Sequence, residues 1–116
     1  MSNDKQRRKE LKKFMSLVKD TPEDCFNKLM FKKYIELKGS IKLANYLNNN
    51  GFRVKTQSKI GQRKYTTVDI YNFMLDEGNQ TDVDSRLINV VKYIVSYAGR
   101  ANWEQRLCYA LNRVKE

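Results

Sequence analysis

The sequence predicts a mainly α fold of about six short helices, in which a helix-turn-helix carries a basic, wing-like β-hairpin insert. Three observations support this prediction. Apolar residues recur at helical spacing along most of the chain. Sequences that typically begin and end helices divide it into short segments. Between residues 52 and 65 the apolar period falls to two, which is typical of paired strands.

The 116 residues are expected to form one domain, because a chain of this length can build one hydrophobic core but not two. Its N-terminal helices are expected within residues 1–39 and its C-terminal helices within residues 79–116. The helix-turn-helix with its hairpin is expected between them, over residues 40–78.

The two N-terminal helices are indicated by apolar spacing and by a capping sequence. The first covers residues 4–19, where the apolar side chains at helical spacing are Leu11, Phe14, Met15 and Val18. The second begins at TPED, residues 21–24, which supplies an N-cap, a proline at the first helical position and an acid three residues after the cap. It ends at Gly39, a typical C-terminal stop.

Capping residues also mark the remaining helices. Ser40 begins a helix that ends at NNNG, residues 48–51, because Asn and Gly tolerate the left-handed backbone that terminates a helix. TTVD at residues 66–69 and TDVD at residues 81–84 begin two further helices. Asn102 begins the last helix.

Positive charge is concentrated in one part of the chain. Twenty-three Lys and Arg residues against thirteen Asp and Glu residues give a net charge of +10. Residues 51–65 hold five positive charges and no negative one, whereas residues 66–80 hold three negative charges. A surplus of this size favours a polyanionic partner, nucleic acid ahead of an anionic membrane. The hairpin is therefore the first candidate for contact with phosphates.

The residue types present argue against an enzyme. The chain has no histidine, which removes the commonest general base and zinc ligand. It has no phosphate-cradling glycine loop and no metal-finger cysteine spacing, so we expect no cofactor and no metal. Cys25 and Cys108 lie far apart in apolar patterns and are expected to be reduced, buried thiols in a cytoplasmic protein. No apolar run reaches the roughly 18 residues of a membrane helix, so no membrane contact is expected.

One motif resembles a known family. Its residues are Ile41, Ala44 and Leu47 on a helix, then Asn48, Gly51 and Arg53, a basic loop, and finally Thr67, Val68 and Leu75. This motif resembles the helix-turn-helix in the DNA-binding recombinase domain of large serine recombinases, and in small phage and plasmid regulators. The resemblance spans residues 40–75 and implies DNA binding, with residues 66–75 near a groove. It does not imply recombination, because the chain has no room for the catalytic serine domain.

The expected recognition helix departs from that family in its charge. At about 100° per residue, Asp69, Asn72 and Asp76 lie together on its outer face, where the family carries basic or neutral side chains. Two carboxylates would repel phosphates unless one accepts a hydrogen bond from a cytosine amino group. We therefore expect the helix to dock by its N-terminal end, where Thr66, Thr67 and free backbone amides reach a phosphate. Plain helix capping by the same residues is an equal alternative.

The expected DNA-binding residues fall into three groups. The hairpin provides phosphate contacts from Arg53, Lys55, Lys59, Arg63 and Lys64, with Gln62 as a polar helper. The recognition helix provides Thr66, Thr67 and Asn72. The N-terminal segment provides Arg7 and Arg8, as a minor-groove arm or as a solvated terminus. If the five hairpin charges each neutralise one phosphate, log K falls against log salt with a slope of about −4 to −5.

The C-terminal helices carry a wide apolar stripe. The helix over residues 81–98 contributes Val83, Leu87, Val90, Val91, Ile94 and Ala98, and the helix over residues 102–115 adds Trp103, Leu107, Leu111 and Val114. A stripe this wide fits a central core helix. It also fits a homodimer interface, since regulators of this size commonly bind two half-sites by two-fold symmetry.

These features together predict a non-enzymatic, sequence-specific double-stranded DNA-binding protein. We expect a transcriptional regulator or an accessory DNA-binding factor of phage, plasmid or bacterial type. Two alternatives stay open. One is a protein-interaction module such as a phage-encoded inhibitor, which the acidic face of the expected recognition helix fits. The other is an RNA-binding protein, in which some of the seven tyrosines supply stacking faces.

Overall fold

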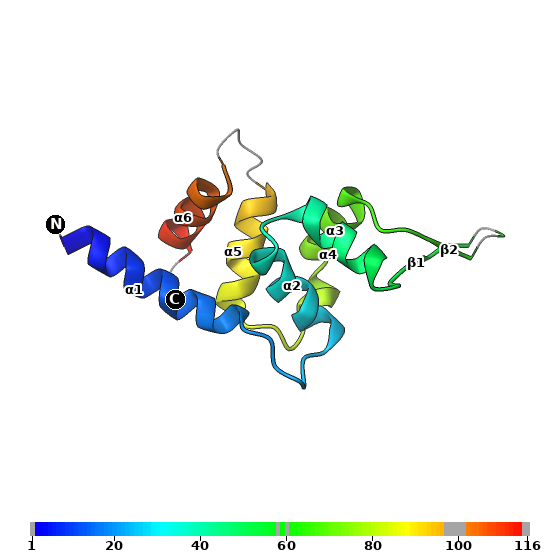
Figure 1. Ribbon diagram of the computed structural model, residues 1–116, viewed down its shortest axis with the longest axis horizontal. Coiled ribbons are helices and arrows are strands. Elements are labelled where there is room, and N and C mark those ends of the chain that lie inside the picture. The colour runs from blue at the N-terminus through cyan, green and yellow to red at the C-terminus, as the bar shows by residue number, and fades with distance from the viewer. Residues whose placement is uncertain (1, 58, 60, 97–101, 115–116) are drawn as a thin grey trace.

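The computed structural model describes the backbone of residues 2–57, 59, 61–96 and 102–114, and the side chains from residue 8 onward within those ranges. This part of the chain forms six α-helices, one 3-10 helix (η1) and two short strands. In chain order they are α1 (Ser2–Val18), α2 (Phe26–Glu36), α3 (Ser40–Asn49), β1 (Val54–Lys55), β2 (Gln62–Arg63), α4 (Thr67–Leu75), η1 (Glu77–Gln80), α5 (Ser85–Ser96) and α6 (Trp103–Arg113). The prediction of a mainly α fold with one hairpin is confirmed (Figure 1).

The hydrophobic core forms around α5, which packs against α1, α2, α4 and α6 (Figure 1). The apolar stripe predicted for this helix is buried within the chain, through Leu87, Val90, Val91 and Ile94. Phe14 of α1 and Tyr34 of α2 fill the same core. Ala98, which the prediction also placed on the stripe, lies outside the described residues. The stripe therefore stabilises the core and leaves α5 little apolar surface for a second subunit.

The apolar surface that remains on the C-terminal helices lies on α6. Trp103 is partly buried and packs against Tyr34, with ring centroids 5.8 Å apart, whereas Tyr109 is exposed. Cys108 on α6 and Cys25 are both exposed. The prediction of two buried thiols is therefore wrong. Cys25 is the N-cap residue just before α2, and so it lies outside the face that α2 buries.

Two of the predicted capping sequences begin their helices as expected. The side chains of Thr66 and Asn102 each accept a hydrogen bond from the N–H group three residues later, at 3.4 and 2.9 Å. These interactions are local in sequence, which is why they are readable from it. At its other end α4 stops at Leu75, before the predicted Gly78, because the carboxylate of Asp76 accepts from the Gly78 N–H at 2.9 Å and begins η1.

The helix predicted to begin at Ser40 does begin there, but its N-cap is Gly39 and no side chain caps it. Two further capping sequences are displaced from the helices that follow them. The sequence beginning at Thr21 forms a turn, in which the Asp24 carboxylate accepts from the Thr21 N–H at 2.9 Å, and α2 begins only at Phe26. Similarly, Asp84 is the residue that caps α5, accepting from the Arg86 N–H at 2.9 Å. In both cases an acid that the pattern placed inside the helix forms a hydrogen bond that holds it outside.

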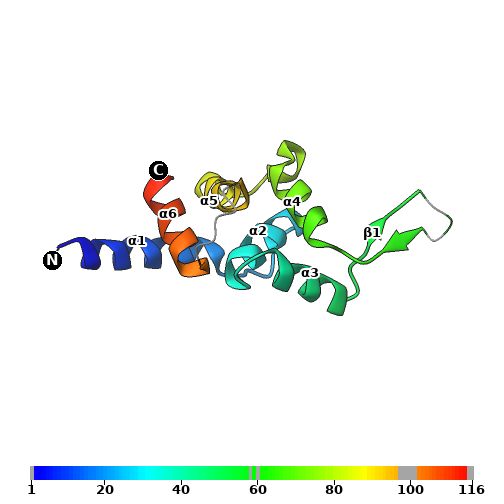
Figure 2. The same ribbon diagram turned by 90° about the horizontal axis from the view of Figure 1, so that it is seen from above.

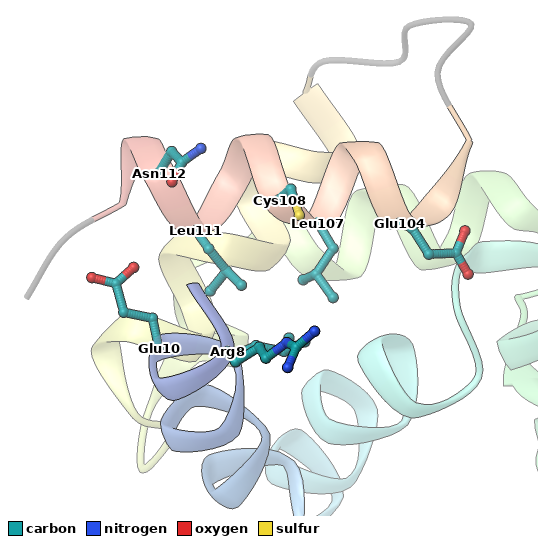
Figure 3. A pocket seen from close by; sticks show the side chains of 8 residues that line it. Arg8, Glu10, Glu104, Leu107, Cys108, Leu111 and Asn112 are labelled. Atoms are coloured by element: carbon teal, nitrogen blue, oxygen red, sulfur yellow. The ribbon is translucent and has the colours of Figure 1, made fainter. Parts of the chain in front are cut away.

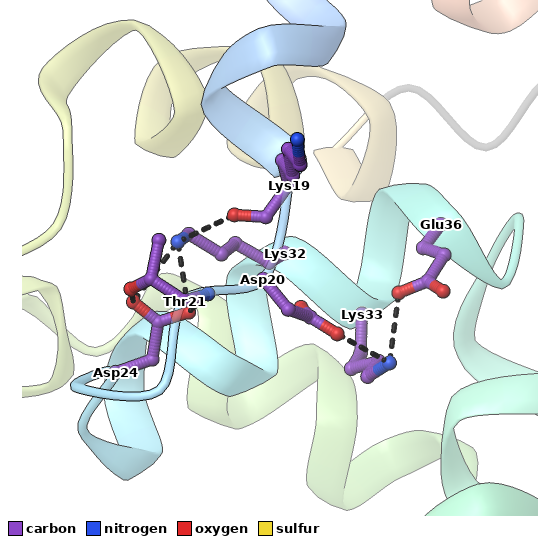
Figure 4. A network of polar contacts seen from close by, with 7 residues as sticks. All are labelled: Lys19, Asp20, Thr21, Asp24, Lys32, Lys33 and Glu36. Atoms are coloured by element: carbon purple, nitrogen blue, oxygen red, sulfur yellow. Dashed lines mark hydrogen bonds and ion pairs between the residues drawn. The ribbon is translucent and has the colours of Figure 1, made fainter.

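A buried ammonium group ties the end of α1 to the start of α2. The Nζ of Lys32 donates to both carboxylate oxygens of Asp24, at 2.9 and 2.8 Å, and to the main-chain carbonyl of Lys19 at 2.9 Å (Figure 4). These oxygens satisfy an ammonium group that α2 holds at the edge of the core. The neighbouring Lys33 instead pairs with two exposed acids, Asp20 at 2.9 Å and Glu36 at 2.8 Å (Figure 4).

The molecule is elongated, with extents of 60 × 34 × 25 Å. The N-terminal end of α1 and the hairpin lie at opposite ends of the long axis in both views (Figures 1 and 2). No helix in the described part of the chain has both the length and the apolar character needed to cross a membrane. The hairpin is thus presented at one end of the molecule, away from the core.

Candidate nucleic-acid interface

The segment between α3 and α4, residues 52–66, extends from the helices as a narrow projection that we call the basic arm (Figures 1 and 2). Its strands pair antiparallel, with Val54 opposite Arg63 and Lys55 opposite Gln62. Beyond them the N–H of Thr56 donates to the carbonyl of Gly61 at 2.9 Å. Each strand has only two residues, so the position of the arm depends on contacts at its root.

Both ends of the basic arm are fixed to the helices. Where the chain leaves α3, the Phe52 N–H donates to the Leu47 carbonyl at 2.9 Å, and the Phe52 ring lies 5.5 Å from that of Phe26. Where the chain returns, the Asn48 Nδ2 donates to the Tyr65 carbonyl at 3.0 Å, and the Tyr65 N–H donates to Asn48 Oδ1 at 2.8 Å. Asn48 thus satisfies the Tyr65 backbone as a neighbouring strand would.

Replacing Asn48 with alanine is expected to loosen the root of the basic arm. Both Tyr65 backbone groups lose their partners in a partly buried place, so the free energy of unfolding should fall by about 2 kcal/mol. Thermal denaturation followed by circular dichroism measures the change. Asn49→Ala is the matched control, because Asn49 is the next residue of α3 and is exposed. Equal losses in the two variants would contradict the role of Asn48.

The two arginines of the basic arm are engaged within the chain. Arg53 Nη1 donates to the carbonyls of Asn48 and Phe52, at 3.0 and 2.7 Å, and so satisfies the end of α3. Arg63 forms a two-pronged ion pair with Asp69, in which both Nη–O distances are 2.6 Å. Both arginines were predicted to contact phosphates, and the structure shows them bonded to protein oxygens at the root of the arm.

The three lysines of the basic arm differ from the arginines. Lys55, Lys59 and Lys64 are exposed and have no partner among the described residues. Gln62, opposite Lys55, is exposed as well. The cations that the arm presents to solvent without a partner are therefore its lysines, which reach outward as separate point charges.

The acids predicted on the outer face of α4 are used within the chain. Asp69 accepts from Arg63 and also from the N–H and hydroxyl of Thr66, at 2.8 and 3.0 Å. The Arg63 guanidinium holds the pKa of the Asp69 carboxyl well below its usual range; burial acts in the opposite direction, and the Thr66 bonds assist Arg63. Asp76 caps η1. The Asp69 charge is thus neutralised by Arg63, whereas the exposed Asp76 carboxylate accepts a hydrogen bond from a backbone N–H and keeps its charge.

Four side chains of α4 remain exposed: Thr67, Val68, Tyr71 and Asn72. The amide of Asn72 has no hydrogen-bond partner among the described residues. Asn72 lines a groove of about 440 Å³ between α4 and the basic arm, whose arm side is formed by Arg53 and Lys55. Of the predicted residues, the structure brings Arg53, Lys55 and Asn72 together along this groove, whereas Thr67 lines a different pocket beside α5.

The predicted N-terminal contacts are not part of this surface. Arg8 lies on α1, toward the opposite end of the molecule. There it lines an apolar groove of about 180 Å³ between α1 and α6, together with Leu11, Leu107 and Leu111 (Figure 3). The side chain of Arg7 lies outside the described residues. A single partner that contacted both this end of α1 and the arm would have to extend along the whole long axis of the molecule.

Neither the spacing of charges nor the capping patterns revealed which arm cations are free. That distinction depends on Asp69 and on the last carbonyls of α3, which reach Arg63 and Arg53 only in the folded chain. Comparisons of this chain with protein-family models, with curated proteins and with solved structures give no match. Function is therefore inferred from the geometry and charge of the residues themselves.

Proposed function

We propose that this protein binds double-stranded DNA through the basic arm and α4, as a transcriptional regulator or an accessory DNA-binding factor. The observation that carries the proposal is the arrangement of charge on the arm. Lys55, Lys59 and Lys64 are exposed and unpaired within the described chain, on a narrow projection. The nearest acid along the chain, Asp69, is already bonded to Arg63 and Thr66. The arm thus offers uncompensated positive charge to a polyanion.

The lysines of the arm are suited to backbone contacts. A DNA duplex carries about one negative charge per 1.7 Å of its axis, so a narrow arm lying along it meets phosphates over its length. Such contacts hold the protein at a position and in an orientation, but they carry little sequence information. Recognition of the DNA sequence must therefore come from another element beside the arm.

The helix α4 is the element that the arm positions. It packs against α3, and its N-terminal residue Thr67 follows directly on the end of the arm. When the arm lies on the phosphates, the outer side of α4 faces the adjoining major groove of the DNA. Its exposed residues are then within reach of the base edges. The role proposed is binding alone.

The test is duplex DNA binding across a range of salt. Labelled duplex of mixed sequence is titrated with the protein at about 50 to 300 mM salt, with fluorescence anisotropy as the readout. Three phosphate contacts give a slope of log K against log salt of about −3. Duplex RNA of the same sequence is the control, and tighter binding to it would favour an RNA target. No DNA binding at the lowest salt would refute the proposal.

A second candidate is a protein-interaction module, which the exposed apolar side chains of α3 and α4 favour. Ile41 exposes 69% of its surface and Val68 63%. The two candidates differ in their response to salt. Contact with phosphates weakens as salt rises, whereas burial of apolar surface against a protein does not.

A further inference from the structure

We propose that α4 reads A·T base pairs in the major groove, with Val68 contacting the methyl group of thymine and Asn72 bonding to adenine. This inference rests on the DNA binding proposed above and adds the class of base pair that is recognised. The residues lie four positions apart, so they share one side of the helix about one turn from each other. Both are exposed, and the buried side of α4 is formed by Ile70 and Met74.

The core does not account for the valine at position 68, which lines a surface pocket of about 320 Å³ with Tyr71 and Val95. Its side chain is 63% exposed and is not among the residues that form or flank the core. A β-branched residue also lowers helix propensity, so it does not stabilise α4 locally. A small apolar side chain at the tip of a helix matches the thymine methyl group, the apolar feature of the major-groove edge. Tyr71, 45% exposed, widens the same apolar side.

Asn72 supplies the polar half of the contact. Its amide carries both a donor and an acceptor, and it has no partner among the described residues. That pair matches the N7 acceptor and N6 donor of adenine, which asparagine recognises with two hydrogen bonds. Asparagine is also a weak helix former, so its place in the middle of α4 has no local structural advantage.

The groups that would read G·C pairs are missing from this side of α4. Guanine is read mainly by arginine or lysine, and α4 contains neither. Cytosine is read by a carboxylate that accepts from its amino group. Two carboxylates line the groove beside Asn72, and both have partners within the chain. Asp69 is held by Arg63 and Thr66, and Asp76 accepts from the Gly78 N–H. An exposed valine, a free amide and an engaged carboxylate together favour A·T pairs.

The test compares three duplexes of equal length at low salt, again by fluorescence anisotropy. One is A·T-rich, the second has the same sequence with deoxyuridine in place of thymidine, and the third is G·C-rich. The deoxyuridine duplex lacks only the methyl groups. The protein should bind the thymine duplex about fourfold more tightly than the deoxyuridine duplex for each methyl group that Val68 contacts. It should bind the G·C-rich duplex about tenfold more weakly than the thymine duplex.

Two variants assign the effects to residues. Val68→Ala should keep DNA binding but lose the difference between thymine and deoxyuridine, and Asn72→Ala should lose most of the preference over the G·C-rich duplex. Ile41→Ala is the matched control, because Ile41 is equally apolar and exposed but lies on α3. Equal binding to all three duplexes would overturn this inference while leaving the proposed function intact. So would a methyl effect that survives in Val68→Ala. Absence of binding to every duplex would instead refute DNA binding itself.

Discussion

Replacing Lys55, Lys59 and Lys64 together with glutamine is expected to weaken binding to duplex DNA by about 100-fold at about 0.1 M salt. The slope of log K against log salt should become shallower by about 2.7, since each lost phosphate contact removes about 0.9. The three lysines are the arm cations without a partner in the described chain, so their removal leaves the contacts at the root of the arm intact. Salt-dependent anisotropy titrations of the variant and the unmodified protein measure both quantities.

A second triple variant separates the arm from net charge. Replacing Lys9, Lys12 and Lys19 with glutamine removes the same three charges from exposed positions near α1, away from the arm. This variant should bind DNA within about threefold of the unmodified protein, because charges beyond a Debye length of about 10 Å act only weakly. If the two triple variants lost affinity equally, the arm would not be the binding element.

The expected slope for the arm is smaller than its composition alone indicates. Five positive charges predict about −4 to −5, but Arg53 and Arg63 have protein oxygens as partners. Breaking the Arg63–Asp69 pair to contact a phosphate would leave the Asp69 carboxylate facing the DNA. The lysines should therefore dominate the salt dependence.

Replacing Asp24 with alanine is expected to lower the free energy of unfolding by about 3 kcal/mol. The ammonium group of Lys32 is largely buried, and the replacement removes the carboxylate that pairs with it. The Lys32 and Asp24 side chains are only 11% and 8% exposed. Asp20→Ala is the matched control, since Asp20 precedes the same turn but is 47% exposed, and its partner Lys33 keeps a second acid, Glu36, at 2.8 Å. Its removal should cost less than about 1 kcal/mol. Urea denaturation measures both variants, and equal losses would contradict the buried role of Lys32.

The same carboxylate makes the stability depend on pH. Burial raises the pKa of Asp24, but its hydrogen bonds from Lys32 and Thr21 outweigh burial and lower the pKa from 3.8 to about 2. The folded state therefore holds the proton less tightly than the unfolded state. The contribution of Asp24 is fully present above pH 3.8 and is lost as the pH falls toward about 2. Over that interval the unmodified protein should lose more stability than Asp24→Ala.

The parts of the fold that the sequence predicted are those set by short-range interactions. Helical spacing identified all the long helices, and the caps at Thr66 and Asn102 are contacts between residues three apart. The start of α2 was misplaced because Asp24 closes a turn with Thr21 ahead of the helix and is held there by Lys32, eight residues later. A pattern confined to four residues contains no information on that partner.

The candidate site was predictable in its location but not in its internal roles. The charge run located the arm, and the helix that follows it began where the capping sequence indicated. The roles of Asn48, Arg53 and Arg63 could not be read in the same way. Each depends on which backbone groups or acids the fold places beside it, and for Asn48 that group is seventeen residues away in the chain.

The central position of α5 links the two ends of the molecule through folding. Because α1, α2, α4 and α6 all pack on this one helix, each of them loses part of the cover over its apolar face if α5 unfolds. A chain built in this way unfolds cooperatively as a single unit. Any ligand that binds only the folded state shifts that single equilibrium, wherever on the surface it binds. A duplex held by the arm would therefore stabilise α1 at the far end of the molecule as much as α4, with no change of structure between them.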